Sequence, residues 1–442
     1  MSSLPIKQAA AEHPESIAFD DGLRKISYAE LTGKVSKHQS AIASLPEGQH
    51  VAWCPRNDWD AFATFWAIQQ HGCVACPISH RFPDATRKEI VERMEAFWLP
   101  DVCSGSDDGR ALRNIDDLNR PATIILSSGS TGPPKAIVHN MAAHIASASG
   151  AATNMPLLPS DRWLWSLPLF HVSGLSILIR CAVAGATVVG VPDHAQLSAS
   201  LLAEQEITHL SVVNTQLRRL LQEENFPSKH LKAILLGGGR VDDTLVSNAR
   251  KRGVAIHTTY GLTEMASQVT TSTADGDPRK NAVLLPGREL MIGPDNEILV
   301  RGQTLCLGYF VDGEIRPVVD EQGWFHTGDL AATDTDQQLT VLGRADNMFV
   351  SGGENIYPEN IERAITKMFD VQQVVVVPRA DKTYGDCPVA FVDGTLPTDW
   401  QTPLRQILQS YEIPVEILAW PANIETGIKP NRKQMEKLAS QP

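Results

Sequence analysis

The residues best suited to bind an anion lie between Leu126 and Lys135, in the run LSSGSTGPPK. Its glycines let backbone N–H groups approach an anion closely, its hydroxyls are further donors, and Lys135 adds a point charge. The apolar, β-branched residues 122–126 before it predict a strand. The run is not a Walker motif, because two prolines follow its second glycine and an alanine follows its lysine. We predict a polyphosphate cradle here; a solvent-exposed turn is the alternative.

Two segments further along the chain have residue types that suit a nucleotide base and a metal ion. Residues 235–239 end a predicted strand in three glycines, where the backbone can approach a flat base, although a tight turn is an equally supported interpretation. Residues 259–264, TYGLTE, place an aromatic ring, a glycine, a hydroxyl and a carboxylate close together. A carboxylate near a polyphosphate is typical of a Mg²⁺ ligand, so we interpret Glu264 in this way; a surface turn is the alternative.

Three polar segments follow toward the C-terminus. Asp329 ends the run WFHTGD, where a carboxylate can accept both hydroxyls of a ribose. Arg344 can reach a phosphate or ribose oxygen, and the glycine-rich residues 351–353 beyond it indicate either a hinge or an ordinary linker. Lys429 lies on a loop close to the end of the chain. Taken singly, each of these charged side chains is more often simply solvated.

Composition and charge exclude several classes of protein. The 442 residues are 43% hydrophobic and 20% charged, which suits a globular protein with a large core. A net charge of −12 argues against nucleic acid or an anionic membrane as the main partner. The N-terminus lacks a signal-peptide pattern, and Pro168, His171 and Arg180 interrupt the most apolar region, so we expect no stable membrane insertion and a cytoplasmic location. Seven scattered cysteines form neither a disulfide framework nor a zinc pattern.

The elements that must position these residues alternate between helices and short apolar strands over the first 240 or so residues. This alternation predicts an α/β fold with a large N-terminal domain of parallel or mixed sheets. From about residue 285 to 343, short strands and turns predict a β-rich subdomain. The last hundred or so residues predict a small α+β unit, with helices at 359–369 and 403–411. We therefore expect domains at 1–343 and 347–442.

Together these six segments resemble, in order and rough spacing, the signature segments of the adenylate-forming superfamily. That superfamily contains acyl-CoA synthetases, peptide synthetase adenylation domains and luciferases, and the resemblance covers essentially the whole chain. Within it the sequence looks most like the o-succinylbenzoate–CoA ligases of menaquinone biosynthesis. The short length, the run SLPLFHVSG at 166–174, SGGE at 351–354 and GIK at 427–429 carry that resemblance.

The resemblance implies ATP, Mg²⁺ and CoA as cofactors and co-substrate, a small carboxylic acid as substrate, and no nucleic acid partner; it leaves a homo-oligomer open. It also implies a mobile C-terminal domain that turns about a hinge at Asp346. Lys429 would bridge the acyl carboxylate and the α-phosphate, Glu264 would hold Mg²⁺, and Thr131 would act with them. One departure is that Ile428 stands where the family usually has glycine.

The resemblance assigns the remaining site residues by position. The phosphates would be bound by the cradle residues Ser127, Ser128, Gly129, Ser130, Thr131, Gly132 and Lys135. The nucleoside would be bound by Gly237, Gly238, Gly239, Tyr260, Gly261 and Thr263, with Asp329 and Arg344 at the ribose. The acid pocket would be lined by His171, Ser173, Gly174, Arg180, Ser211 and Gln268. After domain rotation, Gly352 and Gly353 would face the adenylate where the CoA thiol attacks.

The partner of Arg180 distinguishes the candidate substrates. This residue lies in an apolar segment, where an unpaired guanidinium is costly. Either a protein carboxylate pairs with it, or the second carboxylate of o-succinylbenzoate does. Two other hypotheses stay open. One is the same chemistry on another acid, such as an aryl or medium-chain fatty acid, and the other is a non-catalytic sensor of a nucleotide or acyl-adenylate.

Overall fold

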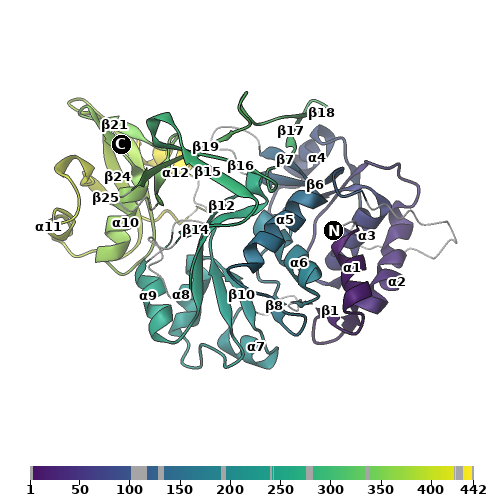
Figure 1. Cartoon of the computed structure of the whole chain (residues 1–442). Helices are drawn as coiled ribbons and strands as arrows, with labels where there is room; N and C mark the ends of the chain where they lie inside the picture. The colour runs from purple at the N-terminus through teal and green to yellow at the C-terminus, as the bar shows by residue number, and fades with distance from the viewer. Residues whose placement is uncertain are drawn as a thin grey trace.

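The computed structural model describes residues 3–100, 117–127, 134–190, 196–238, 241, 243–274, 282–333, 339–422, 424 and 432–440. Four sheets and the helices packed on them make up these parts of the chain (Figure 1). The predicted α/β class is confirmed, with both parallel and antiparallel strand pairs in the large sheets.

A seven-stranded sheet carries the predicted cradle. Its strands, in spatial order, are β18 (Glu314–Arg316), β17 (Gly308–Val311), β7 (Lys135–Asn140), β6 (Pro121–Ser127), β4 (Val74–Pro77), β3 (His50–Trp53) and β5 (Phe97–Trp98). Strands β6, β4, β3 and β5 run parallel, whereas β7 returns antiparallel to β6. The cradle is therefore the loop of a β-hairpin, whose two ends the sheet fixes.

A nine-stranded sheet carries the predicted base and acid sites. Its order is β14 (Ala282–Leu284), β13 (Ser267–Ser272), β12 (Ile256–Leu262), β11 (Ala233–Leu236), β10 (His209–Val212), β8 (Arg162–Leu164), β9 (Thr187–Val189), β1 (Ile17–Asp20) and β2 (Lys25–Ser27). The strands from β12 across to β1 are parallel, so their carboxyl ends share one edge. Ligands of open α/β sheets bind at that edge.

Helices fill the space between the two large sheets and cover their outer faces. They are α1 (Pro5–Glu12), α2 (Tyr28–Gln39), α3 (Trp59–His71), α4 (Asp84–Arg93), α5 (Met141–Ala152), α6 (Val172–Ala184), α7 (Ala199–Glu204), α8 (Asn214–Gln222) and α9 (Asp243–Lys251), with a 3₁₀ turn at Ser40–Ile42. The main apolar cluster joins α3 and α6 to strands of both sheets. It contains the fully buried Trp66 and Trp163. This core fixes α6, which carries Arg180.

The predicted β-rich region forms a four-stranded antiparallel sheet of β15 (Arg288–Ile292), β16 (Glu297–Gly302), β19 (Phe325–Thr333) and β20 (Leu339–Arg344). Two 3₁₀ turns, Thr263–Met265 and Pro294–Asn296, lie beside it. Its apolar cluster includes Met265 and Val269, so it packs directly against the residues that follow β12.

The C-terminal residues form a five-stranded sheet of β22 (Glu354–Ile356), β21 (Phe349–Ser351), β24 (Gly385–Gly394), β23 (Val371–Asp381) and β25 (Glu416–Ala419). Helices α10 (Pro358–Met368), α11 (Gln401–Leu404) and α12 (Arg432–Ala439) and a 3₁₀ turn at Ser410–Glu412 accompany it. Two apolar clusters belong to this unit alone. Figure 1 shows it at the opposite end of the molecule from α1–α3. The division at Asp346 and its mobility stay predictions.

The helix expected at 403–411 is wrong. Helix α11 ends at Leu404, and only a 3₁₀ turn follows at Ser410–Glu412. Leu404 is buried, but Ile407 is 43% exposed, so the apolar side chains of this segment do not share one buried face. A helix of two to three turns without such a face is marginal in water.

Disulfides and membrane-spanning helices are the two features to look for in the described residues. None of the six cysteines among them forms a disulfide. In the same residues, no helix combines the length and the apolarity needed to cross a membrane.

Candidate active site

The ends of the predicted cradle face each other across the β6–β7 hairpin. Ser127 and Lys135 are cross-strand partners, and the Lys135 ammonium lies 5.0 Å from the ring centroid of Tyr309, in a cation–π contact. Ser128, Gly129, Ser130, Thr131 and Gly132 lie outside the described residues. The hairpin thus presents the positive charge of Lys135 at the start of β7.

Tyr309 connects the cradle to Glu264. Its ring contacts Lys135, and its hydroxyl donates a hydrogen bond of 2.9 Å to Glu264 Oε1. Burial and the nearby Glu264 carboxylate raise the pKa of Tyr309, so the phenol stays a neutral donor. Tyr309 was not among the predicted site residues. Its run, LGYF, has no local signature, and only the pairing of β17 with β7 brings it to the site.

Glu264 fits a Mg²⁺ ligand. Its Oε1 receives the Tyr309 hydrogen bond, and a carboxylate has further lone pairs that a cation can share. Within the described residues, no group of three or more histidine, cysteine or acidic side chains could hold a metal. Mg²⁺ is commonly held by one or two carboxylates together with substrate phosphates, so a single carboxylate opposite a cradle is a suitable donor set.

The predicted nucleoside residues come together between β12 and the β19–β20 pair. Tyr260 donates a 2.8 Å hydrogen bond to Asp329 Oδ2, and Arg344 Nη1 lies 3.3 Å from Asp329 Oδ1. Asp329 and Arg344 are directly opposite each other in the β19–β20 register. Burial and the Asp329 carboxylate raise the pKa of Tyr260 well above its ordinary value. Arg344 also contacts Asp346, the predicted hinge residue, at 3.1 Å.

The glycines at the carboxyl end of β11 leave room that a side chain would fill. A Cβ at Gly237 would lie 2.8 Å from Cγ2 of Thr259 on the neighbouring strand, and Gly238 has a φ of +81°. Gly239 lies outside the described residues. In β12, a Cβ at Gly261 would come within 2.0 Å of the carbonyl oxygen of Ser267, so this close backbone approach requires glycine.

Arg180 is buried, and its hydrogen-bond partners among the described residues are neutral groups. Its Nη2 donates to Gln268 Oε1 at 2.7 Å and to Ser267 Oγ at 3.3 Å, and its guanidinium lies 5.3 Å from the Trp163 ring centroid. Among the described residues, no carboxylate pairs with it, and its Nε has no hydrogen-bond partner. Burial, with the nearby Arg288 as a smaller cause, lowers the pKa of Arg180 to about 10. The side chain therefore stays charged at neutral pH.

Of the predicted acid-pocket residues, Gln268 contacts Arg180 directly, and the others lie along α6 or on β10. Ser173 precedes it by about two turns of α6, so the two share a helix face. His171 is the N-cap residue of α6, and a Cβ at Gly174 would lie 2.1 Å from the Pro168 carbonyl oxygen. Ser211 is buried behind Trp163, whose Nε1 donates to its hydroxyl at 3.2 Å.

The C-terminal unit holds the remaining predicted residues. Gly352 and Gly353 have φ values of +58° and +91° in an exposed turn between β21 and β22. Lys429 lies outside the described residues. The helix that follows it is anchored by Arg432, which donates to the Val376 carbonyl at 2.7 Å and forms an ion pair with Glu362 at 2.7 Å.

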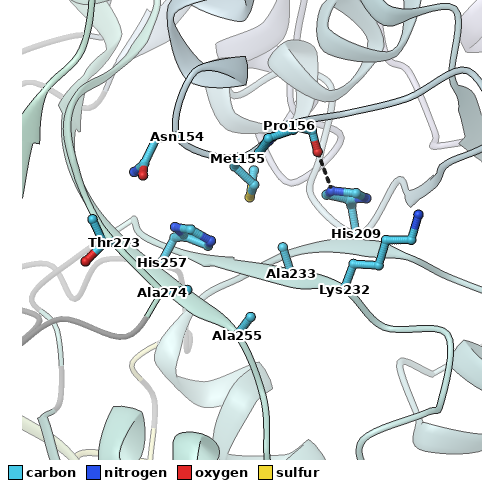
Figure 2. Close-up of a pocket in the computed structure, with 10 residues that line it drawn as sticks. All are labelled: Asn154, Met155, Pro156, His209, Lys232, Ala233, Ala255, His257, Thr273 and Ala274. Atoms are coloured by element: carbon cyan, nitrogen blue, oxygen red, sulfur yellow. Dashed lines mark hydrogen bonds between the residues drawn. The ribbon is translucent and has the colours of Figure 1, made fainter.

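A cavity of about 380 Å³ lies elsewhere, at the amino ends of β10–β12. Figure 2 shows its walls, with the imidazoles of His209 and His257 on either side of Ala233. His209 Nε2 donates to the Pro156 carbonyl at 3.1 Å, and Lys232, at the rim, pairs with Asp161 at 2.6 Å. Its position at the amino ends sets it apart from the predicted nucleotide site.

Comparisons with known proteins agree with this arrangement. The model of a family described as AMP-binding enzyme matches residues 99–310. A 2-succinylbenzoate–CoA ligase of Haemophilus influenzae is 37% identical over 93% of this chain and 92% of its own length. That of Salmonella typhimurium is 42% identical over 90% of this chain and 89% of its own.

Solved structures give the same result. A variant of Escherichia coli MenE with bound OSB-AMS is 31% identical, with a TM-score of 0.87 over 100% of this chain and 99% of its own. The o-succinylbenzoate coenzyme A synthetase of Bacillus subtilis in complex with ATP and magnesium is 27% identical, with a TM-score of 0.86 over 98% of this chain and 99% of its own.

Proposed function

The chain belongs to the 2-succinylbenzoate–CoA ligase family of AMP-binding enzymes, and on this premise we propose how its residues join o-succinylbenzoate to CoA. In the first step, an oxygen of the succinyl carboxylate attacks the α-phosphorus of ATP, and the bond to pyrophosphate breaks. In the second step, the CoA thiol loses its proton and attacks the acyl carbon of the adenylate, and AMP leaves. The products are o-succinylbenzoyl-CoA, AMP and pyrophosphate.

The residues of the chain supply position and charge for the first step. Glu264 holds Mg²⁺, which when bound supplies positive charge at the phosphate oxygens. The cradle from Ser127 to Lys135 holds the β- and γ-phosphates, and Lys429 neutralises charge that develops at the α-phosphate. The ion pair of Asp329 and Arg344 beside Tyr260 supports their assignment to the nucleoside.

The observation that carries the choice of acid is the environment of Arg180. A buried guanidinium is stable beside a planar anion, yet its partners among the described residues are an amide oxygen and a hydroxyl. The aromatic carboxylate of o-succinylbenzoate is such an anion, and it stays free when the other carboxylate is adenylated. Benzoate and fatty acids have a single carboxylate, so none stays free after adenylation. Ser173, Gln268 and the His171 side of α6 line the rest of this pocket.

The second step needs the C-terminal unit to turn. We assign the hinge to Asp346, because its ion pair with Arg344 lies where β20 leads into the C-terminal unit. The turn withdraws Lys429 and brings Gly352 and Gly353 to the adenylate. The net charge of −12 supports a protein without nucleic acid or an anionic membrane as its main partner, and we propose a cytoplasmic location.

Pyrophosphate release with ATP and Mg²⁺ tests the proposal on a panel of acids, with and without CoA. The panel contains o-succinylbenzoate, its mono-methyl ester at the aromatic carboxylate, benzoate and octanoate. We expect turnover with the free diacid alone. Preference for benzoate or octanoate would assign the same chemistry to another acid. If no acid in the panel gave pyrophosphate release and the protein still bound ATP, the sensor hypothesis would be favoured. Lys429→Ala, which should bind ATP without turnover, is the matched control.

A further inference from the structure

The turn between β12 and β13 has an unfavourable backbone conformation. It runs from Thr263 to Gln268 and includes the first two residues of β13, and two of its residues with side chains have positive φ, +51° at Ala266 and +117° at Ser267. L-residues other than glycine rarely adopt such values, and they persist only where the surroundings impose them. The surroundings of this turn are therefore expected to hold it in place.

Three separate elements hold the carbonyl groups of the turn. Ser147 Oγ, from α5, donates to the Ala266 carbonyl at 2.8 Å. His139 Nε2, from β7, bonds to the Thr263 carbonyl at 2.7 Å. The backbone N–H of Cys306 donates to the Glu264 carbonyl at 2.7 Å. A carbonyl only accepts, so His139 must carry its proton on Nε2.

A buried arginine reinforces the same turn. Arg288 Nε donates to the Gln268 carbonyl at 2.7 Å, and its Nη2 lies 3.2 Å from Ser147 Oγ. A Cβ at Gly150 would lie within 2.2 Å of Arg288 Nη1, so the glycine of α5 makes room for this guanidinium. Ser147 is thus held between the turn and the arginine that supports its far end.

The two ends of the turn belong to two different binding sites. Glu264, at the start, is the proposed Mg²⁺ ligand and receives the Tyr309 hydrogen bond. Ser267 and Gln268, at the end, contact Arg180 of the acid pocket at 3.3 and 2.7 Å. Because so few residues separate them, a change in the backbone at Ala266 moves both groups together.

We propose that Ser147 and His139 are positioning residues for the adenylation step. They hold the Thr263–Gln268 turn in its left-handed conformation, and the turn keeps the metal ligand and the acid-binding amide at one fixed spacing. This inference rests on the proposed function, because it takes Glu264 as the metal ligand and Arg180 as the acid ligand. Neither Ser147 nor His139 needs to touch a substrate for this role.

Ser147→Ala and His139→Leu test the proposal, since each removes one donor to the turn. We expect both variants to raise the KM for o-succinylbenzoate and the KM for Mg·ATP together, each by roughly three- to tenfold, as for the loss of one hydrogen bond. His139→Gln keeps an N–H donor at a similar reach and should restore both values. Ser228→Ala is the matched control, because it also removes a buried hydroxyl that holds a loop N–H, at the opposite end of the strands.

A merely structural role predicts a different pattern. It would lower the melting temperature and the amount of active enzyme, as Ser228→Ala is expected to do, and leave both KM values unchanged. Unchanged KM values, a shift in only one of them, or failure of His139→Gln to differ from His139→Leu would overturn the inference. Dissociation constants for Mg·ATP and for the diacid, measured by calorimetry in the same variants, give the same comparison without turnover. An inactive parent would count against the proposed function alone.

Discussion

Replacing Arg180 with methionine should weaken binding of the acid without destabilising the unliganded protein. Methionine reaches about as far as the arginine Nε and carries no charge, so the substitution removes the guanidinium head and keeps the packing of the aliphatic stem. Acid binding weakens while the stability of the unliganded protein stays nearly the same only if the anionic partner of Arg180 is the substrate. The two effects therefore separate the two interpretations that the apolar sequence context of Arg180 leaves open.

The structure gives the size of both effects. Arg180 is 5% exposed, and burial already disfavours its charge, as its pKa of about 10 indicates. Its loss leaves the Gln268 amide oxygen without that donor, which costs about 1–3 kcal/mol, while the cost of burying a charge disappears. We expect the free energy of unfolding to change by no more than about 1 kcal/mol in either direction. Breaking a true buried ion pair would instead cost about 3–5 kcal/mol.

For the substrate, a charge-assisted hydrogen bond contributes about 1.5–3 kcal/mol. Loss of two such bonds at the lower end of this range, about 3 kcal/mol, should raise the KM for o-succinylbenzoate roughly a hundredfold. The mono-methyl ester, which lacks the second carboxylate, should lose much less in the same variant. Comparing diacid and ester in both proteins isolates the contribution of this one contact.

Urea unfolding and pyrophosphate release are the two assays. Arg162→Met is the matched control for stability, since Arg162 pairs with the buried Asp20 at 3.0 Å, and its loss should cost several times more than that of Arg180. If Arg180→Met proved as destabilising as Arg162→Met and left the diacid KM unchanged, the reasoning about Arg180 would be refuted. Its partner would then be a protein carboxylate.

Three further predictions follow from the same geometry. Arg180→Lys should make the acid KM depend on pH. Burial favours the neutral amine and lowers the pKa of the lysine below its ordinary value, so the KM of the variant should rise with pH in a range where the KM of the parent, whose Arg180 has a pKa of about 10, stays flat. Tyr309→Phe removes the hydrogen bond to Glu264 and should raise the KM for Mg·ATP about fivefold with the diacid KM unchanged; equal shifts would contradict this role. Gly261→Ala places a Cβ 2.0 Å from the Ser267 carbonyl oxygen, so the melting temperature should fall clearly, and a normal value would show that the turn yields.

The contiguous signatures were the most predictable part of the site. The cradle run at 126–135, Glu264 and Asp329 could be proposed because each lies in a short run whose residue types suggest its chemistry, whereas the antiparallel return of β7 along β6 could not. The meeting of Asp329 with Arg344 could not be read from the sequence, because it depends on the register of β19 against β20. Their common assignment to a ribose came from the resemblance to a family, and the cross-strand pair supplies a physical reason for it.

Residues that act through distant partners were the least predictable. Tyr309, Ser147 and His139 have no local signature, and each reaches the site from an element that is far away in the sequence. The error at 403–411 has a different cause. Apolar residues there have helical spacing, yet the tertiary structure buries Leu404 and leaves Ile407 exposed, so packing overrides the pattern.

The position of β17 has a consequence for how the protein is made. Strand β7 is covered on one side by β6, which precedes it, and on the other by β17, which the ribosome delivers only after the whole nine-stranded sheet. Until residues 308–311 emerge, the nascent chain carries the phosphate-binding hairpin with an open edge strand, a known site of unwanted pairing. A chain stopped near residue 300 should therefore be prone to aggregate, and because it lacks Tyr309, Asp329 and Arg344 it should also be inactive.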